Sequence, residues 1–146
     1  MDVEWIEIAE PANYNGSAVY EIRIVERGEP AIIDRFLASD DRGIISIGMT
    51  TMMETRRRKF VSGMTRGRGH SEGNLLFRIR QFAPFDQKFP KPVLQYKFFK
   101  VKSKEEADRM EGHRIKAYVR KFGEVPPLNS AIPKRYDEDG WQEELG

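Results

Sequence analysis

Two apolar stretches near the start of the chain have the spacing of β-strands, and they limit the folds that the chain can adopt. Every second residue from Ala18 to Ile24 is apolar or aromatic, which predicts a strand over residues 18–25. Residues 43–50 form a second apolar stretch that ends where a helical pattern begins. Weaker patterns predict short strands at residues 3–8 and 31–37. Because short turns separate these stretches, we expect the strands to pair antiparallel.

Two segments with helical features follow the second strand. Thr51 with Glu54 fits a capping box, which predicts a helix to about residue 61 that Gly63 ends. Residues 74–83 have apolar side chains at helical spacing and predict a second helix. A proline-rich stretch at residues 84–92 marks a connecting loop after it.

A further strand and a long helix complete the pattern. Residues 93–101 alternate and predict a strand. Ser103 with Glu106 fits a second capping box, and Gly123 follows the helical spacing that ends at Phe122. We therefore predict a helix that begins after Ser103 and ends at about Phe122.

The order of these elements predicts an α+β fold, in which helices flank a small antiparallel β-sheet of three core strands with an extra hairpin. The length of 146 residues suits one domain, which we place at residues 1–134, followed by an acidic, disordered tail at residues 135–146. The absence of cysteine excludes disulfides, a zinc–thiolate site and a cysteine nucleophile. Because no apolar run is long enough to cross a membrane, we expect a cytoplasmic protein.

Positive charge is concentrated in the middle of the chain, although the net charge is only +2. Residues 56–68 carry six cations and no acid, and residues 88–104 carry six lysines and no acid. Basic segments of this kind are typical of proteins that bind a polyanion. From charge alone, a solvated basic surface is an equal alternative.

Glu111 stands where the pattern of the last helix calls for an apolar residue. At about 100° per residue, Ala107, Ile115, Tyr118 and Phe122 all fall within about 40° of Glu111. A buried carboxylate without a partner costs several kcal/mol, so it requires a cation, a metal ion or a water-filled cleft. A salt bridge at the edge of the core is the structural alternative.

Three more polar side chains suit either packing or chemistry. Arg56 shares a helix face with Phe60, where it suits phosphate binding. Alternatively, its side chain lies over the core and extends its guanidinium to water, or it pairs with Glu111. Tyr20 lies on the inward face of the first strand, where it is either a core residue or a site residue. His70 lies in a glycine-rich basic loop, where it is either a phosphate contact or a surface side chain.

The order of these features resembles a known family. Ala18-Val19-Tyr20 resembles the first element of the GIY-YIG nuclease family, and Ser46-Ile47-Gly48 resembles the second. Arg56 follows Ser46 by ten residues, where the family has its essential arginine on the first helix.

The later motifs of the family also have counterparts. Glu111 resembles the metal-binding glutamate, and Asn129 resembles the asparagine that closes the motif set. His70 falls in the region where some members carry a histidine. The resemblance extends over residues 17–132.

The resemblance implies a metal-dependent endonuclease that hydrolyses DNA phosphodiester bonds with one divalent ion, Mg²⁺ or Mn²⁺. Glu111 would hold the metal, Arg56 would bind the scissile phosphate, and Tyr20 would orient or deprotonate the attacking water. Asn129 would position neighbouring groups, and His70 would assist near the phosphate.

Helical spacing points Arg57 and Arg58 outward. The cations that would track the DNA backbone are Arg57, Arg58, Lys59, Arg66 and Arg68.

Ser46 replaces the tyrosine of the second element, and this degenerate position motivates an alternative function. A catalytically impaired module on the same scaffold would bind nucleic acid, DNA or RNA, without cleaving it. A third hypothesis is an interaction protein that uses its acidic tail. For a nuclease, sequence specificity would come from loops, from the partner in a homodimer or from another protein.

Overall fold

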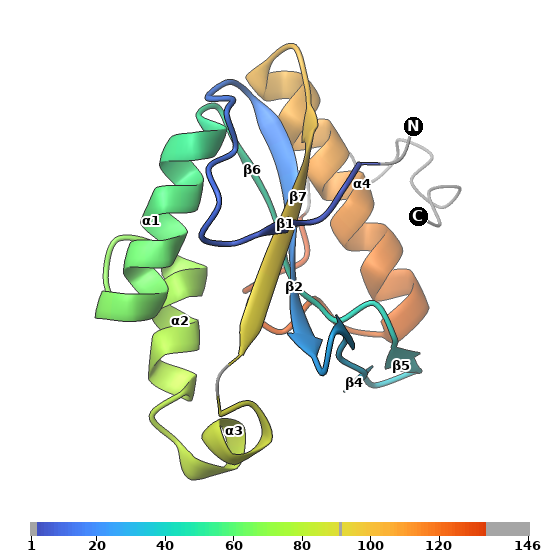
Figure 1. Cartoon of the computed structure of the whole chain (residues 1–146). Helices are drawn as coiled ribbons and strands as arrows, with labels where there is room; N and C mark the ends of the chain where they lie inside the picture. The colour runs from blue at the N-terminus through green and yellow to red at the C-terminus, as the bar shows by residue number, and fades with distance from the viewer. Residues whose placement is uncertain (1–2, 91, 134–146) are drawn as a thin grey trace.

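An antiparallel sheet lies between helices in the computed structural model, which describes residues 3–90 and 92–133 (Figure 1). Strand β2 (Ala18–Glu26) lies between β6 (Ile44–Thr50) and β7 (Val93–Lys100) and pairs antiparallel with both. These strands are the three core strands that the hydrophobic pattern predicts.

Four short strands complete the β-structure. Strand β1 (Ile6–Glu7) extends the sheet beyond β7, and β3 (Glu29–Pro30) pairs with the end of β2. Strands β4 (Ile33–Asp34) and β5 (Ser39–Asp40) form a separate hairpin in the segment between β3 and β6. The strand expected over residues 31–37 is therefore much shorter, and the extra hairpin is confirmed.

The helices cover both faces of the sheet. Helices α1 (Met53–Arg66) and α2 (Ser71–Ile79) lie on one face, and α4 (Lys104–Phe122) lies on the other (Figure 1). Helix α3 (Ala83–Lys88) is a short turn of helix before β7, in a stretch expected to be a loop. Proline is tolerated there because Pro84 lies in the first turn, where its missing N–H has no intrahelical partner to lose.

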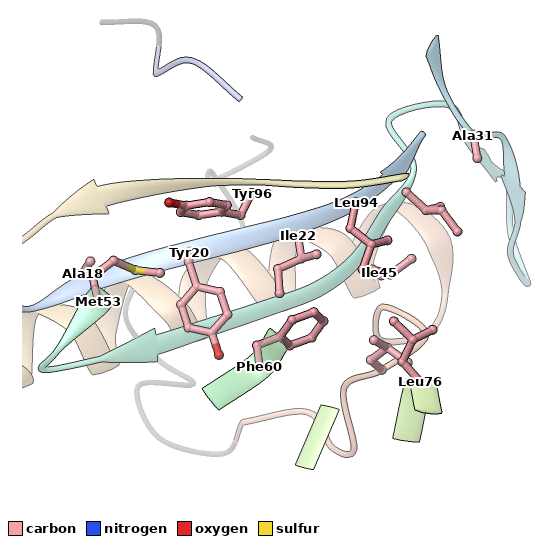
Figure 2. Packing of buried hydrophobic residues seen from close by; sticks show 12 residues of the cluster. Ala18, Tyr20, Ile22, Ala31, Ile45, Met53, Phe60, Leu76, Leu94 and Tyr96 are labelled. Carbon is pink, nitrogen blue, oxygen red and sulfur yellow. The ribbon is translucent and has the colours of Figure 1, made fainter. Parts of the chain in front are cut away.

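The main core lies between β2 and the first two helices. The inward face of β2, including Tyr20 and Ile22, packs with Met53 and Phe60 of α1 and Leu76 of α2 (Figure 2). The opposite face of the sheet packs on α4 through two smaller clusters. The alternating pattern of residues 18–25 is confirmed, with the strand one residue longer at its end.

Helix α4 has the ends that the sequence predicts. The backbone N–H of Glu106 donates to the hydroxyl of Ser103 at 3.1 Å, and Lys102 N donates to the Glu106 carboxylate at 3.2 Å. Gly123 ends the helix at φ 81°, in the left-handed region that glycine enters without strain.

The capping box predicted for α1 is wrong. The helix begins at Met53, so the N-cap residue is Met52 and not Thr51, and its thioether side chain makes no capping hydrogen bond. The carboxylate of Glu54 has other partners. It accepts from the backbone N–H of Ala12 at 2.7 Å and from the Arg57 guanidinium at 2.6 and 2.8 Å. These hydrogen bonds, led by those from Arg57, lower the pKa of Glu54 to about 2.

Gly63 does not end α1, which continues to Arg66 and ends at Gly67. Gly63 instead lies where α1 crosses α2, close to the backbone of Gly73 and Asn74. The two glycines allow the helix backbones to approach closely, so a residue that resembles a helix stop serves packing. Helix α2 begins earlier than expected, at Ser71, and ends earlier, at Ile79.

The observed fold is therefore α+β, with a mostly antiparallel sheet flanked by helices. The predicted acidic tail at residues 135–146 lies outside the described residues. Among the residues that are described, no helix has the length and apolar character needed to span a bilayer.

We expect Gly73→Ala to destabilise the fold by about 1–3 kcal/mol through overpacking. A Cβ atom at this position would lie 2.7 Å from the Phe60 carbonyl oxygen and 3.1 Å from Gly63 Cα, and both are backbone atoms of α1. Urea unfolding measures the change.

The matched control is Gly112→Ala in α4, where no atom lies within 4 Å of the added Cβ. Higher helix propensity should make that variant more stable by about 0.5–1 kcal/mol. Equal stability of Gly73→Ala and the wild type would contradict the close crossing.

Candidate active site at the edge of strand β6

Tyr20 and Gly48 face each other across β2 and β6, which places the tyrosine over a residue without a side chain. A Cβ atom at position 48 would overlap the Tyr20 hydroxyl and lie 2.5 Å from its ring carbon Cζ. The ring of Tyr20 therefore lies against the backbone of β6, and only glycine leaves room for it.

Arg56 reaches Tyr20 from α1. Its Nε donates a hydrogen bond to the Tyr20 hydroxyl at 3.2 Å. Burial, together with the field of Glu72, raises the pKa of Tyr20 to about 12. The phenol therefore keeps its proton near neutral pH, and its oxygen serves as an acceptor that orients the guanidinium.

Within the described residues, no strand pairs with the outer edge of β6, and other groups satisfy its backbone. Ile45 O accepts from Leu128 N at 2.8 Å. The side-chain amide of Asn129 accepts from Ile47 N at 3.0 Å and donates to Ile47 O at 2.8 Å. The next amide along the edge, Met49 N–H, donates to the Glu111 carboxylate. The edge of β6 thus positions two of the predicted site residues, Asn129 and Glu111.

Glu111 is half-buried on α4 beside that edge. Burial, followed by the nearby carboxylates of Asp108 and Glu72, raises the pKa of Glu111 to about 7. The Met49 hydrogen bond and the positive charge of Arg56 oppose this shift. Glu111 and Arg56 thus interact through their charges, but these two described residues do not form the salt bridge that the sequence leaves open as an alternative.

Glu72 is a member of the site that the sequence hypotheses miss. It lies in the first turn of α2, and its carboxylate accepts from the hydroxyls of Ser71 at 2.8 Å and Ser46 at 3.4 Å. Its charge acts on Tyr20 and Arg56 as well as on Glu111. A prediction that α2 begins at Ser71 would have placed Glu72 in the first turn of the helix. The sequence pattern instead predicts a helix from residue 74, which leaves Glu72 in the loop before it.

His70 is buried instead of lying in a mobile surface loop. Its Nδ1 caps α2 by accepting from Gly73 N at 3.2 Å, and its ring packs edge-on against Phe60 at 5.2 Å. Burial lowers the pKa of His70 to about 4, so the imidazole is neutral near pH 7. Its Nδ1 lies 3.4 Å from the Glu72 carboxylate, but an ion pair there requires a proton that His70 does not carry near neutral pH. The structure therefore favours a capping role for His70 over a cationic phosphate contact.

A cleft of about 360 Å³ lies beside the edge of β6. The polar groups on its walls are Arg56, Ser71, Glu72, Glu111, Asn129 and Ser130. Apolar walls come from Ile47, Leu75, Ile115 and Leu128. Arg56, Glu111 and Asn129 are distant in sequence, yet they line one cavity, and Tyr20 borders it through its hydrogen bond to Arg56.

The donor chemistry of the cleft suits a hard divalent cation only in part. Among the described residues, no group of three or more His, Cys, Asp or Glu side chains could hold a metal ion. Magnesium, however, is commonly held by one or two carboxylates, with water and phosphate oxygens as the other ligands. Glu111 is a suitable carboxylate for such an ion, and it lines the cleft.

Four of the five cations predicted to contact DNA are exposed. These are Arg58, Lys59, Arg66 and Arg68. Arg57 is buried, at 9% exposure, so its predicted outward orientation is wrong. It pairs with Glu54 and donates to the backbone carbonyl of Ile8 at 2.9 Å, because α1 is covered on that side by residues 8–12.

Comparison with protein-family models, with curated proteins and with solved structures found no match to this chain.

We expect Glu111→Gln to stabilise the protein at pH 8 but not at pH 4. The folded-state pKa of about 7 lies above the ordinary glutamate value of 4.5, so protonated Glu111 favours the folded state and that contribution is lost as the pH rises toward 7. Glutamine mimics the protonated form at every pH. After allowance for solvent screening, we expect a gain on the order of 1–2 kcal/mol at pH 8.

Thermal unfolding at both pH values tests this expectation. The control is Glu105→Gln on the same helix, because the Glu105 side chain is 77% exposed and should change stability little. A loss of stability for Glu111→Gln at pH 8 would show that the ionised carboxylate supports the fold.

Proposed function

We propose that this chain is a metal-dependent endonuclease of the GIY-YIG type, which hydrolyses DNA phosphodiester bonds in the cleft beside β6. The observation that carries the proposal is the convergence of Arg56, Glu111 and Asn129 on that cleft. Each residue comes from a different part of the chain, and the sequence motifs point to each of them independently of the structure. A perturbed carboxylate beside an arginine in a cleft is also a common property of catalytic sites.

Arg56 binds the scissile phosphate in this proposal. Its Nε is occupied by the Tyr20 hydroxyl, and its terminal nitrogens remain available for two phosphate oxygens. Burial opposes the charge of Arg56, but Tyr20, Glu72 and Glu111 more than compensate and raise the pKa of the guanidinium. The cation is thus fixed in place before the negative charge of the transition state develops.

Glu111 holds the divalent ion, and Asn129 fixes the strand edge beside it. A bound Mg²⁺ or Mn²⁺ supplies charge stabilisation at the phosphate and at the leaving oxygen. Affinity for the ion favours the ionised form of Glu111, whose own environment raises its pKa. A divalent ion would therefore give the half-buried carboxylate of Glu111 a partner of opposite charge.

Tyr20 acts as an orienting group and not as a proton acceptor. With a pKa of about 12, roughly one phenol in 10⁵ is ionised at pH 7. Its hydroxyl is held between the backbone of β6 and Arg56. The role that remains is to set the angle at which the guanidinium enters the cleft.

Loss of catalysis on the same scaffold is the second candidate function, and the serine at position 46 favours it. Ser46 is fully buried, and its hydroxyl donates to Glu72. If catalysis depends on the tyrosine phenol of the second element, this chain lacks the required group, because residue 46 is a serine. The module would then bind DNA or RNA through its exposed cations without cleaving it.

We expect the wild-type protein to nick supercoiled plasmid DNA in the presence of Mg²⁺, and Glu111→Ala and Arg56→Ala to lose at least about 10²-fold in rate. Gel electrophoresis of the topological forms measures the reaction. The two inactive variants control for contaminating nucleases. Glu105→Ala, made and purified identically, controls for the loss of a carboxylate from α4 and should cleave like the wild type. Equal cleavage by all four proteins would contradict the proposal. Binding without cleavage in all four would favour the non-catalytic module.

A charge variant tests the DNA-binding surface. Replacement of Lys59, Arg66 and Arg68 by alanine should weaken DNA binding and lower the slope of log K against log salt by about 2–3, because each lost phosphate contact contributes about 0.9. Fluorescence anisotropy at several salt concentrations measures both effects. Arg57→Ala should instead reduce stability and leave the salt slope unchanged, because Arg57 is buried against Glu54. An unchanged slope in the triple variant would place the DNA elsewhere.

A further inference from the structure

We propose that Glu72 is the general base of this site and takes the proton from the water that attacks the phosphorus. The inference rests on the proposed function and adds a catalytic residue to it. It starts from the position of the Glu72 carboxylate on the wall of the cleft that also contains Arg56 and Glu111.

The backbone around Glu72 holds the carboxylate firmly in place. Glu72 lies in the first turn of α2, directly after the cap that His70 makes with Gly73 N. The next residue, Gly73, is the point where α2 crosses α1 near Gly63. A group on a capped helix end at a tight crossing has little freedom to move, which is what precise proton transfer requires.

The carboxylate of Glu72 has room for a water molecule. Its two oxygens receive one hydrogen bond each from the serine hydroxyls, Ser71 at 2.8 Å and Ser46 at 3.4 Å. An ionised carboxylate has about four acceptor positions, so acceptor capacity remains. The side chain is 12% exposed, which makes it accessible from the cleft and otherwise shielded from solvent.

The other candidate bases at the site are occupied. The Tyr20 hydroxyl is a buried phenol that accepts a hydrogen bond from Arg56, and it must lose its own proton first. The Nδ1 atom of His70 accepts from Gly73 N, so Nε2 carries the proton of the neutral ring and cannot accept another. His70 also does not line the cleft. Glu111 is assigned to the divalent ion. Among the described residues that line the cleft, Glu72 is the carboxylate left for the water.

The small size of Ser46 is consistent with this role. Ser46 is fully buried and directs its hydroxyl at Glu72. A large side chain at position 46 would extend into the space that the Glu72 carboxylate occupies. The departure from the family pattern at Ser46 and the presence of a carboxylate at position 72 are therefore two parts of one arrangement.

The chemical step balances without any additional reactant. The water oxygen bonds to phosphorus while one water proton passes to the Glu72 carboxylate. The bond from phosphorus to the 3′ oxygen breaks, and that oxygen takes a proton from solvent. Glu72 then returns its proton to solvent, which leaves a 5′-phosphate and a 3′-hydroxyl.

The test compares Glu72→Gln with Glu111→Gln and with Ser71→Ala in the full chain. Three quantities are measured: kcat and KM for plasmid nicking with Mg²⁺, Mn²⁺ affinity by electron paramagnetic resonance, and DNA affinity without metal. We expect Glu72→Gln to lower kcat by about 10²–10⁴-fold, with KM, Mn²⁺ affinity and DNA affinity within about threefold of the wild type. Glu111→Gln should lose both kcat and Mn²⁺ affinity, and Ser71→Ala should retain kcat within about tenfold.

Glu72→Asp separates chemistry from packing, because it keeps the charge and withdraws the carboxylate by one methylene. We expect its kcat to lie between those of the wild type and Glu72→Gln, and this variant replaces Glu72→Gln if the latter does not fold. Wild-type kcat in Glu72→Gln, beside an inactive Glu111→Gln, would overturn the role of Glu72 alone. Loss of Mn²⁺ affinity in Glu72→Gln would also overturn it, because Glu72 would then be a metal ligand. A wild-type protein that cleaves no DNA would overturn the proposed function, and the role of Glu72 with it.

Discussion

The outer edge of β6, with which no described strand pairs, is the constraint on which the arrangement of the cleft depends. An edge strand presents backbone groups that need partners, and here they come from a neighbouring chain segment and from side chains. Leu128 and Asn129 bond to Ile45 and Ile47, and Glu111 accepts from Met49. Because these partners come from α4 and the segment after it, satisfying the edge brings distant polar groups to one place.

The cleft holds its charges at an energetic cost. Burial is the largest cause of the raised pKa of Glu111, and the charges of Asp108 and Glu72 add to it. Arg56 offsets part of this cost, because its positive charge interacts with both Glu72 and Glu111. A hydrogen bond to Tyr20 orients its guanidinium. Such a balance favours any ligand that brings positive charge to the carboxylates and negative charge to the arginine, and a metal ion with a phosphate does both.

Neighbouring arginines of one helix have different roles because of what covers them. Arg56 faces the cleft, whereas Arg57 pairs with Glu54 and bonds to Ile8 in the segment that crosses α1. Arg58 is exposed. An arginine thus belongs to the site, to the fold or to the surface according to its neighbours. The number of charges along the sequence therefore indicates the class of partner, but not which arginines contact that partner.

The sequence by itself determined the core strands, the boundaries of α4 and the place of Glu111 in an apolar stripe, because periodicity and capping are local properties. It also selected Arg56 and Asn129, which line the same cleft as Glu111. Only the tertiary structure decided the roles of Glu72, His70 and Gly63, since these depend on where α2 begins and how it crosses α1. Contacts between helices and across strand edges are set by packing in space, and the spacing of residues along the chain does not record them.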